Sequence, residues 1–166
     1  MNRTNEEAVM NSTDLQHLRT AIEVAQKARE HGNHPFGTML VDENNRVFLK
    51  AENSVVTSND CTAHAETNLM RLASQQFSTD ELEKCTLYTS TEPCAMCAGA
   101  IYWGNVGRVV YALSEVGLYE IIGPSPEQLL LPSREVFAHS QRHVEVVGPV
   151  LELEDEARAV HSGFWK

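Results

Sequence analysis

The chain lacks two features that would assign whole classes of protein: long apolar runs and a secretory leader. None of its 166 residues lies in an apolar stretch near the roughly 18 residues that a membrane-spanning helix needs. The first 13 residues are polar and lack the apolar centre of a signal peptide. The sequence therefore predicts no membrane association and a location in the cytoplasm.

Positive charge is also scarce. The chain has 13 Lys and Arg against 23 Asp and Glu, a net charge of −10 with neutral histidines. Proteins that bind nucleic acid gain affinity from clustered cations that displace phosphate counterions, but the arginines here are scattered singly. The acidic residues at 152–156 are best explained as a solvated helix face. This balance argues against nucleic acid and favours a small-molecule partner.

The composition is otherwise that of a globular domain. Hydrophobic residues make up 42% of the chain, enough for a core, and no linker or repeat divides it. We expect one domain over residues 1–166, in which 1–13 form a flexible polar N-terminus and 114–166 form a C-terminal extension of the same domain.

Hydrophobic periodicity predicts alternating helices and strands. The three- and four-residue spacing predicts a helix over 14–31, followed by two strands at 37–42 and 46–51 that are joined by a polar turn. Further helices are expected at 63–73, 94–103 and 151–161, and further strands at 85–90, 106–113 and 144–147. Residues 115–134 contain three prolines and show no clear period. The pattern indicates an α/β sandwich with a mixed sheet.

Two short segments, Thr62–Glu66 and Glu92–Cys97, carry residues suited to metal chemistry. Cys94 and Cys97 lie three residues apart at a predicted helix start, so both sulfurs project on one side of its first turn. His64 opens another helix and supplies a third donor. One His and two Cys leave one tetrahedral position open, as in catalytic zinc sites that bind a water. Glu66, two residues beyond His64, is then placed beside that water as a general base.

The cysteines also fit two further kinds of site. A C-x-x-C pair occurs in thiol redox proteins, although those usually carry it after the first strand. A closed structural zinc site would need a fourth ligand, which Cys61 or Cys85 could provide. Disulfides are not expected, because nothing in the sequence indicates secretion.

The motif His64-Ala65-Glu66 followed by Pro93-Cys94-Ala95-Met96-Cys97 resembles the H-x-E…P-C-x-x-C signature of the cytidine deaminase superfamily. The resemblance runs from about Pro35 to Tyr111 and is greatest to the branch of guanine deaminases and tRNA adenosine deaminases. It implies a three-layer α/β/α sandwich with a mixed, mainly five-stranded sheet. It also implies one Zn²⁺ per subunit and a homodimer, with the Ile101–Trp103 region or the C-terminal segment in the interface.

The resemblance implies roles for individual residues. His64, Cys94 and Cys97 would hold zinc, and Glu66 would shuttle protons. The substrate would contact Asn53, the Ala65 backbone, and the apolar walls Phe36 and Trp103. Guanine deaminases of this branch also use an acidic residue after the following strand, for which Glu115 or Glu120 could substitute. They close the pocket with a C-terminal aromatic residue, for which Phe164 or Trp165 is available.

The resulting prediction is a zinc hydrolase that deaminates a small amino-nucleobase or nucleoside, with a purine such as guanine favoured and ammonia released. Three alternatives stay open. The first is a cytosine-type or other amino-heterocycle substrate. The second is a tRNA adenosine deaminase, which the net charge of −10 disfavours. The third is a non-catalytic zinc-stabilised binding domain, which would not require Glu66.

Overall fold

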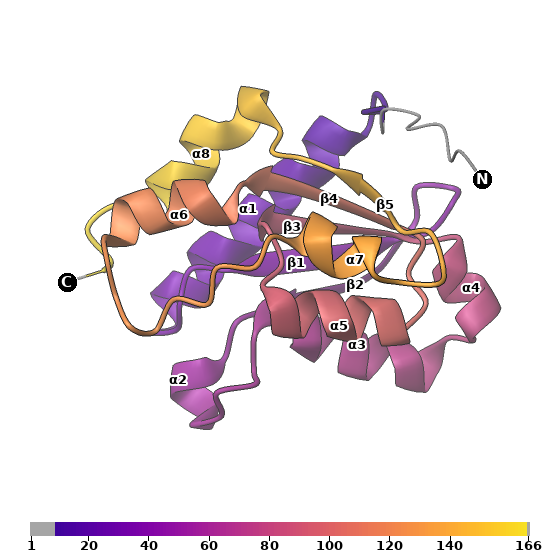
Figure 1. The fold of residues 1–166 in the computed structure, drawn as a ribbon, viewed down its shortest axis with the longest axis horizontal. Coiled ribbons are helices and arrows are strands. Elements are labelled where there is room, and N and C mark those ends of the chain that lie inside the picture. Colours follow the sequence, from indigo (N-terminus) through magenta and orange to yellow (C-terminus); the bar gives the residue numbers. More distant parts are fainter. Residues whose placement is uncertain (1–8, 166) are drawn as a thin grey trace.

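The fold is built on one five-stranded sheet, seen in a computed structural model that describes residues 9–165. The strands are β1 (Gly37–Val41), β2 (Val47–Glu52), β3 (Thr86–Thr91), β4 (Arg108–Leu113) and β5 (Glu145–Val147). They lie in the order β2-β1-β3-β4-β5 (Figure 1). β1 is antiparallel to β2 and β3, whereas β3, β4 and β5 run parallel, so the predicted mixed sheet of five strands is confirmed.

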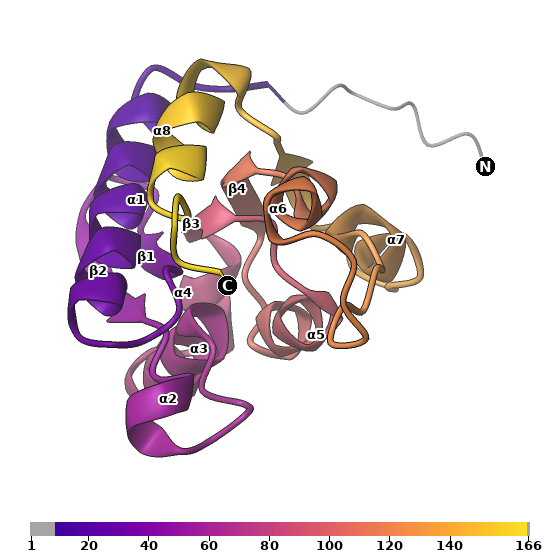
Figure 2. The same cartoon turned by 90° about the vertical axis from the view of Figure 1, so that its left-hand side faces the viewer.

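Helices cover both faces of the sheet and make the predicted three-layer sandwich (Figure 2). One face carries α1 (Asp14–Glu30), the short η1 (Leu151–Leu153) and α8 (Glu154–Ala159). The opposite face carries α3 (Ala65–Gln76), α5 (Ala95–Trp103) and α7 (Ser133–Ala138). Three more short helices connect these elements: α2 (Val55–Ser58), α4 (Thr79–Glu83) and α6 (Glu115–Ile122).

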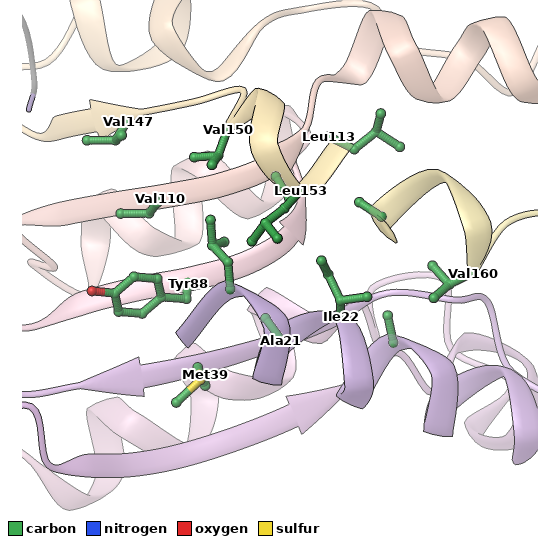
Figure 3. Close-up of a cluster of buried hydrophobic side chains, with 14 of the residues drawn as sticks. Ala21, Ile22, Met39, Tyr88, Val110, Leu113, Val147, Val150, Leu153 and Val160 are labelled. Atoms are coloured by element: carbon green, nitrogen blue, oxygen red, sulfur yellow. The ribbon is translucent and has the colours of Figure 1, made fainter. Parts of the chain in front are cut away.

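Each face of the sheet has its own apolar core, because alternate residues of a strand point to opposite sides. Met39 and Val110 join the cluster under α1 and α8, whereas their neighbours Leu40 and Val109 join the cluster under α3 and α5. Figure 3 shows the first cluster, with Met39, Tyr88, Val110 and Val147 from the strands meeting Ala21 and Ile22 of α1. The inner strands β1, β3 and β4 are therefore buried on both sides, whereas the edge strand β2 is partly exposed.

Helix α1 lies unusually close to the start of β1. A Cβ atom on Gly37 would stand 2.3 Å from the backbone nitrogen of Ala25 and 2.5 Å from the backbone oxygen of Ala21. Backbone atoms cannot swing aside as a side chain can, so only glycine allows this approach. Gly37 thus sets the distance between the outer helix and the strand that begins beside the candidate site.

A buried ion pair ties the start of α1 to the sheet. Asp14 is fully buried, and its Oδ1 accepts hydrogen bonds from Tyr88 Oη (2.7 Å) and Arg108 Nη1 (2.8 Å). Its Oδ2 accepts from Arg108 Nη2 (2.8 Å) and from the backbone of Asn11 (2.7 Å). Burial alone would raise the pKa of Asp14, but the hydrogen bonds from Arg108 and Tyr88 outweigh burial and lower it.

The predicted elements and the observed ones differ mainly in the short helices. Every predicted strand is present, with boundaries that move by one or two residues, and the helices at 14–31, 63–73 and 94–103 are present. The predicted terminal helix is divided into η1 and α8. Helices α2, α4, α6 and α7 were not predicted, because four to eight residues are too few to show a 3.6-residue period.

The N-terminal prediction is covered only in part. Residues 1–8 of the expected flexible segment lie outside the described residues, whereas Met10 packs against the core cluster under α1. Asn11 and Thr13 bond to each other and to the start of α1. Within residues 9–165, no helix combines the length and the apolar character needed to cross a membrane.

Candidate metal and catalytic site

Three potential metal ligands meet where two helices begin. His64 is the N-cap of α3, and Cys94 is the N-cap of α5, both with extended backbone. Cys97 lies in the first turn of α5 and is buried. His64 Nδ1 is 3.6 Å from the sulfur of Cys94 and 3.6 Å from the sulfur of Cys97. The three ligand atoms all lie within 4.8 Å of one another, so one ion can contact all three.

The chemistry of this donor set fits zinc. One imidazole nitrogen and two sulfurs form a tetrahedral set with one open position, as in catalytic zinc sites. Hydrogen bonds from Cys97 and His64 lower the pKa of Cys94 to about 4, although burial opposes them. The same hydrogen bond to Cys94, together with burial, raises the pKa of Cys97. The opposite shifts mean that one proton is held between the two sulfurs. A bound dication favours the thiolate form of both, so metal binding releases this proton.

Glu66 lies directly beside the ligands. Its side chain is only 5% exposed, in the first turn of α3. Oε1 accepts a hydrogen bond from the Thr89 hydroxyl at 2.7 Å, and Oε2 is 3.4 Å from the sulfur of Cys97. Burial raises the pKa of Glu66, and the hydrogen bond from Thr89 counteracts part of this effect. A carboxyl group with a raised pKa holds a proton more readily than usual and can both accept and return it.

Asn53 offers a hydrogen-bond donor that the described residues leave unused. The residue is 1% exposed, and its backbone N–H donates to the carbonyl of Phe36 (3.0 Å). Its Oδ1 accepts from the backbone of Val55 (3.0 Å), whereas Nδ2 has no partner within residues 9–165. An unpaired buried amide is costly unless a ligand satisfies it. Ala65, the other predicted polar contact, is fully buried at the first position of α3.

The C-terminal aromatic residues pack against Phe36. The ring of Phe36 is 5.3 Å from that of His161 and 6.1 Å from that of Trp165. Trp165 Nε1 donates to Nδ1 of His161 (3.2 Å) and so fixes the orientation of both rings. The Trp165 ring also lies 5.3 Å from His34, on the segment that leads to Phe36. The last residues of the chain therefore reach the start of β1, where Phe36 and Asn53 meet.

Trp103 does not join this group in a single chain. It is the last residue of α5, nine positions after Cys94 and six after Cys97, so at 1.5 Å per residue the helix carries it roughly 9 to 13 Å along its axis from these two ligands. Its side chain is 81% exposed and contacts the ring of Tyr102. The aromatic wall that the resemblance implied at this position is therefore not formed within one chain.

An acidic residue does follow β4 near the ligands. Glu115 is 3% exposed; its Oε1 accepts from the Tyr119 hydroxyl (3.2 Å), and Oε2 has no partner among the described residues. Burial, together with the charges of Glu92 and Cys94, raises the pKa of Glu115 to about 7. Glu120, the other candidate, instead pairs with Arg158 at the surface (2.9 Å).

Two buried residues around the site, Thr89 and Glu92, were assigned no role from the sequence. In sequence, Thr89 cannot be distinguished from other threonines in strands, and only the folded structure shows its contact with Glu66. Glu92 accepts hydrogen bonds from the backbone of Glu115 (3.0 Å) and from the backbone and hydroxyl of Ser133 (both 2.9 Å). Glu92 thereby holds the first turns of α6 and α7 close to Cys94. Only its position two residues before that cysteine could have indicated it.

The remaining cysteines do not complete a closed metal site in the part of the chain that the structure describes. Cys61 is exposed in the loop after α2, and Cys85 is buried beside the carbonyl of Glu81 (3.3 Å). Burial raises the pKa of Cys85 to about 11, as for a structural thiol. The potential metal site contains neither residue. The geometry thus favours an open three-ligand site over a closed one.

Comparison with known proteins gives a consistent family. The family model for the cytidine and deoxycytidylate deaminase zinc-binding region matches residues 11–113, more than half of the chain. A probable cytosine deaminase of Schizosaccharomyces pombe is 46% identical over 158 residues, 94% of each chain. The guanine deaminase of Bacillus subtilis is 36% identical over 72% of this chain and 83% of its own. A tRNA-specific adenosine deaminase of the same bacterium is 35% identical over 92% of this chain and 89% of its own.

Solved structures agree with the sequence relatives. The guanine deaminase of Nitrosomonas europaea superposes with a TM-score of 0.74 and 26% identity, covering 94% of this chain and 86% of that one. The α/β/α sandwich described above is therefore shared with a solved member of this group.

Proposed function

Since the chain belongs to the cytidine and deoxycytidylate deaminase family, hydrolytic enzymes that bind zinc, we propose that it deaminates a free amino-nucleobase. The observation that carries this proposal is the buried Glu66 carboxyl group beside the open ligand set of His64, Cys94 and Cys97. A purely structural metal site would not need a buried carboxyl group there. The reaction consumes one water, replaces a ring C–NH₂ with C=O and releases NH₃.

Glu66 moves the protons in this reaction. When bound, zinc lowers the pKa of a coordinated water toward neutrality and so supplies the nucleophile. Glu66 accepts a proton from the attacking water and gives it to the ring nitrogen next to the reacting carbon. It then carries the second proton to the departing amine, which leaves as ammonia. The raised pKa of Glu66 suits both the accepting and the donating step.

Asn53 orients the ring. Its free Nδ2 donor matches a ring carbonyl oxygen, which both cytosine and guanine carry. Phe36 is joined to Asn53 through a backbone hydrogen bond, and its ring, packed against His161 and Trp165, offers an apolar wall near this residue. The first residue of α3, Ala65, supplies backbone beside the ligands. These roles are consistent with a flat heterocycle held by one polar edge.

Two rings are candidates within this class. The relative named a probable cytosine deaminase matches over nearly the whole chain, whereas the guanine deaminase matches over a shorter part at lower identity. We therefore rank a cytosine-type ring ahead of guanine, the purine that the sequence analysis favoured. Guanine stays the second candidate because Glu115 presents a free buried carboxylate oxygen that could accept the N–H groups of a purine edge.

A tRNA substrate is the weaker alternative, despite the tRNA-specific relative. The chain carries a net charge of −10, and the helix near its end, α8, opens with three acidic residues. Such a surface repels a phosphate backbone. A gel shift with tRNA at low salt tests this directly: we expect no shift, and tight, salt-sensitive binding would contradict the free-base proposal.

Ammonia release by the zinc-loaded protein tests the function. The panel contains cytosine, cytidine, guanine, guanosine, adenine and adenosine, with Glu66→Ala as the blank. We expect turnover of one or two free bases that is absent from the blank. Turnover only of nucleosides would overturn the free-base proposal. No turnover of any compound, with one zinc per chain confirmed, would favour another amino-heterocycle or a non-catalytic domain. Those two are distinguished by whether the cobalt-substituted protein changes its spectrum with substrate analogues.

We also propose a homodimer in which α5 lies at the interface. This helix has no charged residue, and its outward stripe exposes Met96 and Trp103 beside the half-buried Gly99 and Tyr102. A helix that is apolar on all sides is normally covered on all sides. The uncharged face also lets two copies of an acidic chain approach without direct repulsion. Light scattering should give about twice 18.5 kDa, and Trp103→Asp should lower that mass; a wild-type monomer would contradict the proposal.

A further inference from the structure

Thr89 contacts Glu66, and the reaction proposed above gives this contact no role. It lies in β3, fully buried, on the face of the sheet that α3 covers. Its hydroxyl oxygen is 2.7 Å from Oε1 of Glu66, 3.1 Å from the carbonyl of Thr91 and 3.5 Å from the carbonyl of Gly37. A threonine hydroxyl has one hydrogen and can donate only one of these bonds.

The distances decide which bond is made. The Glu66 oxygen is the nearest acceptor, and a carboxylate is a stronger acceptor than a backbone carbonyl. Both carbonyls lie farther from the hydroxyl, so its hydrogen goes to Oε1. The other oxygen, Oε2, lies toward the metal ligands, 3.4 Å from the sulfur of Cys97. The two oxygens of Glu66 are therefore not equivalent in this fold.

We propose that Thr89 is a positioning residue that holds Oε1 of Glu66, so that Oε2 alone accepts and returns the transferred proton. The proposal rests on the proposed role of Glu66. A carboxylate rotates about its last side-chain bond with little resistance, and without Thr89 either oxygen could turn toward the reacting ring. With Oε1 held, the proton from the attacking water moves to Oε2, then to the ring nitrogen, and the second proton follows the same route to the amine.

The sheet contains a matched control for this hydroxyl. Thr38 pairs directly with Thr89 across β1 and β3, is equally buried and faces the same side. Its hydroxyl donates to the backbone carbonyl of Tyr88 (2.7 Å) and makes no hydrogen bond to Glu66. Replacing either threonine with valine keeps its shape and removes one buried hydroxyl. A difference between the two variants therefore reports the bond to Glu66 rather than the loss of a buried hydroxyl.

The test compares Thr89→Val, Thr89→Ser, Thr38→Val and Glu66→Gln by kcat, KM, zinc content and unfolding midpoint, with the best substrate of the panel. We expect kcat of Thr89→Val to fall on the order of 10- to 100-fold, as when a catalytic group is misplaced. KM should stay within about twofold, because the lost interaction acts on the proton-transfer step. Thr89→Ser keeps the donor and should stay within about threefold of wild type, and Thr38→Val within about twofold.

Three outcomes would overturn the proposal. They are a Thr89→Val kcat within about threefold of wild type, an equal loss in Thr38→Val, and a Thr89→Ser loss as large as that of Thr89→Val. If Thr89→Val does not fold or loses zinc, Thr89→Ala is compared with Thr89→Ser, which must still recover kcat. The Glu66→Gln variant distinguishes failure of the proposed role of Glu66 from failure of the proposed role of Thr89. If it retains turnover, the role of Glu66 fails; if only the Thr89 variants retain turnover, the positioning role fails alone.

Discussion

Two buried carboxyl groups at opposite ends of the sheet have opposite surroundings. Asp14, near the start of β4, receives four hydrogen bonds, two of them from the paired Arg108, and its pKa is lowered. Glu66, near the end of β3, receives hydrogen bonds only from the Thr89 hydroxyl and the Cys97 thiol among the described residues, with no cationic side chain bonded to it; its pKa is raised. Burial acts on both, so the difference comes from their partners.

The two ends of the sheet therefore differ in role: the Asp14 end stabilises the fold, and the Glu66 end carries the reactive groups. Four buried side-chain polar atoms have no partner within residues 9–165: Asn53 Nδ2, Thr91 Oγ1, Glu115 Oε2 and His161 Nε2. All belong to residues around the candidate site: Thr91 precedes Cys94 by three positions, and His161 packs on Phe36. The Asp14 end contributes none of them. Buried polar groups normally have a partner, so a ligand or an ordered water is expected at this end of the sheet.

The largest effect is expected from a change that disrupts only the end of the sheet that carries the metal ligands. Cys94→Ala removes one of three ligands, so zinc should be lost and turnover should fall on the order of 10⁴-fold or more. Metal analysis and ammonia release check this, with chelator-treated wild type as the reference. The far end should keep its structure, because Asp14 and Arg108 make no contact with the ligands. A variant that retains one zinc per chain would contradict the ligand assignment.

Glu66→Gln tests the reactive carboxyl group while leaving all three metal ligands in place. The amide keeps the shape and the contact with Thr89 but cannot shuttle protons, so kcat should fall on the order of 10³- to 10⁴-fold. Zinc content should not change. The unfolding midpoint at neutral pH should not fall, since an underpaired buried carboxyl group has been made neutral. Turnover near that of wild type would refute the proton-transfer role.

Asp14→Asn should produce the opposite result, a stability loss with normal catalysis. Removing one partner of a buried ion pair leaves Arg108 uncompensated and should cost about 3 kcal/mol in urea unfolding near pH 7. The folded pKa of Asp14 lies below its usual 3.8, so its contribution is present above that pH and is lost as pH falls through the folded value. The difference between wild type and variant should therefore shrink below about pH 4.

An exposed pair provides the control for Asp14. Glu156→Gln removes the surface partner of Arg19, 3.3 Å away, and should cost less than about 0.5 kcal/mol. The turnover of folded Asp14→Asn protein should stay within about twofold of wild type. If kcat falls with stability, the two ends of the sheet are coupled and do not have separate roles.

The smallest effect expected from a change at the candidate site concerns Glu115. Its pKa of about 7 lies above the usual 4.5, so the stability of the fold decreases as pH rises from about 4.5 to about 7 and stays at the lower value above that. Glu115→Gln should therefore raise stability by about 1–3 kcal/mol near pH 8 and have no effect below about pH 4.5. Unfolding curves at both pH values check this. A stability loss near pH 8 would show that the ionised carboxylate has a partner.

The sequence predicted the elements that are long or periodic and the site residues that are close in sequence. Helix α1 and the five strands follow from hydrophobic spacing, and His64, Glu66, Cys94 and Cys97 follow from two short motifs. Helix α6 has only eight residues and follows β4 without a periodic signal, so it was missed. Local patterns are read from neighbouring residues, and short helices depend on contacts elsewhere in the fold.

The contacts that complete the site could not be predicted because they join distant segments. Thr89 meets Glu66 across a strand and a helix, and Glu92 meets Ser133 across forty-one positions. Trp103 shows that closeness in sequence need not bring a residue close in space: it follows the ligands by a few residues, and the rise of the helix carries it away from them within one chain. Distance along a helix accumulates at 1.5 Å per residue, whatever the motif suggests.

The close approach of α1 to Gly37 also bears on how the chain folds. The contact joins Ala21 and Ala25 to a strand that follows them closely in sequence, so forming it closes only a short loop and costs little chain entropy. Because loop-closure entropy is lower for nearby segments, we expect this contact to form before parallel pairs such as β3 with β4. Helix α1 and β1 can thus act as a first-formed unit onto which the later strands, and with them the metal ligands, are assembled.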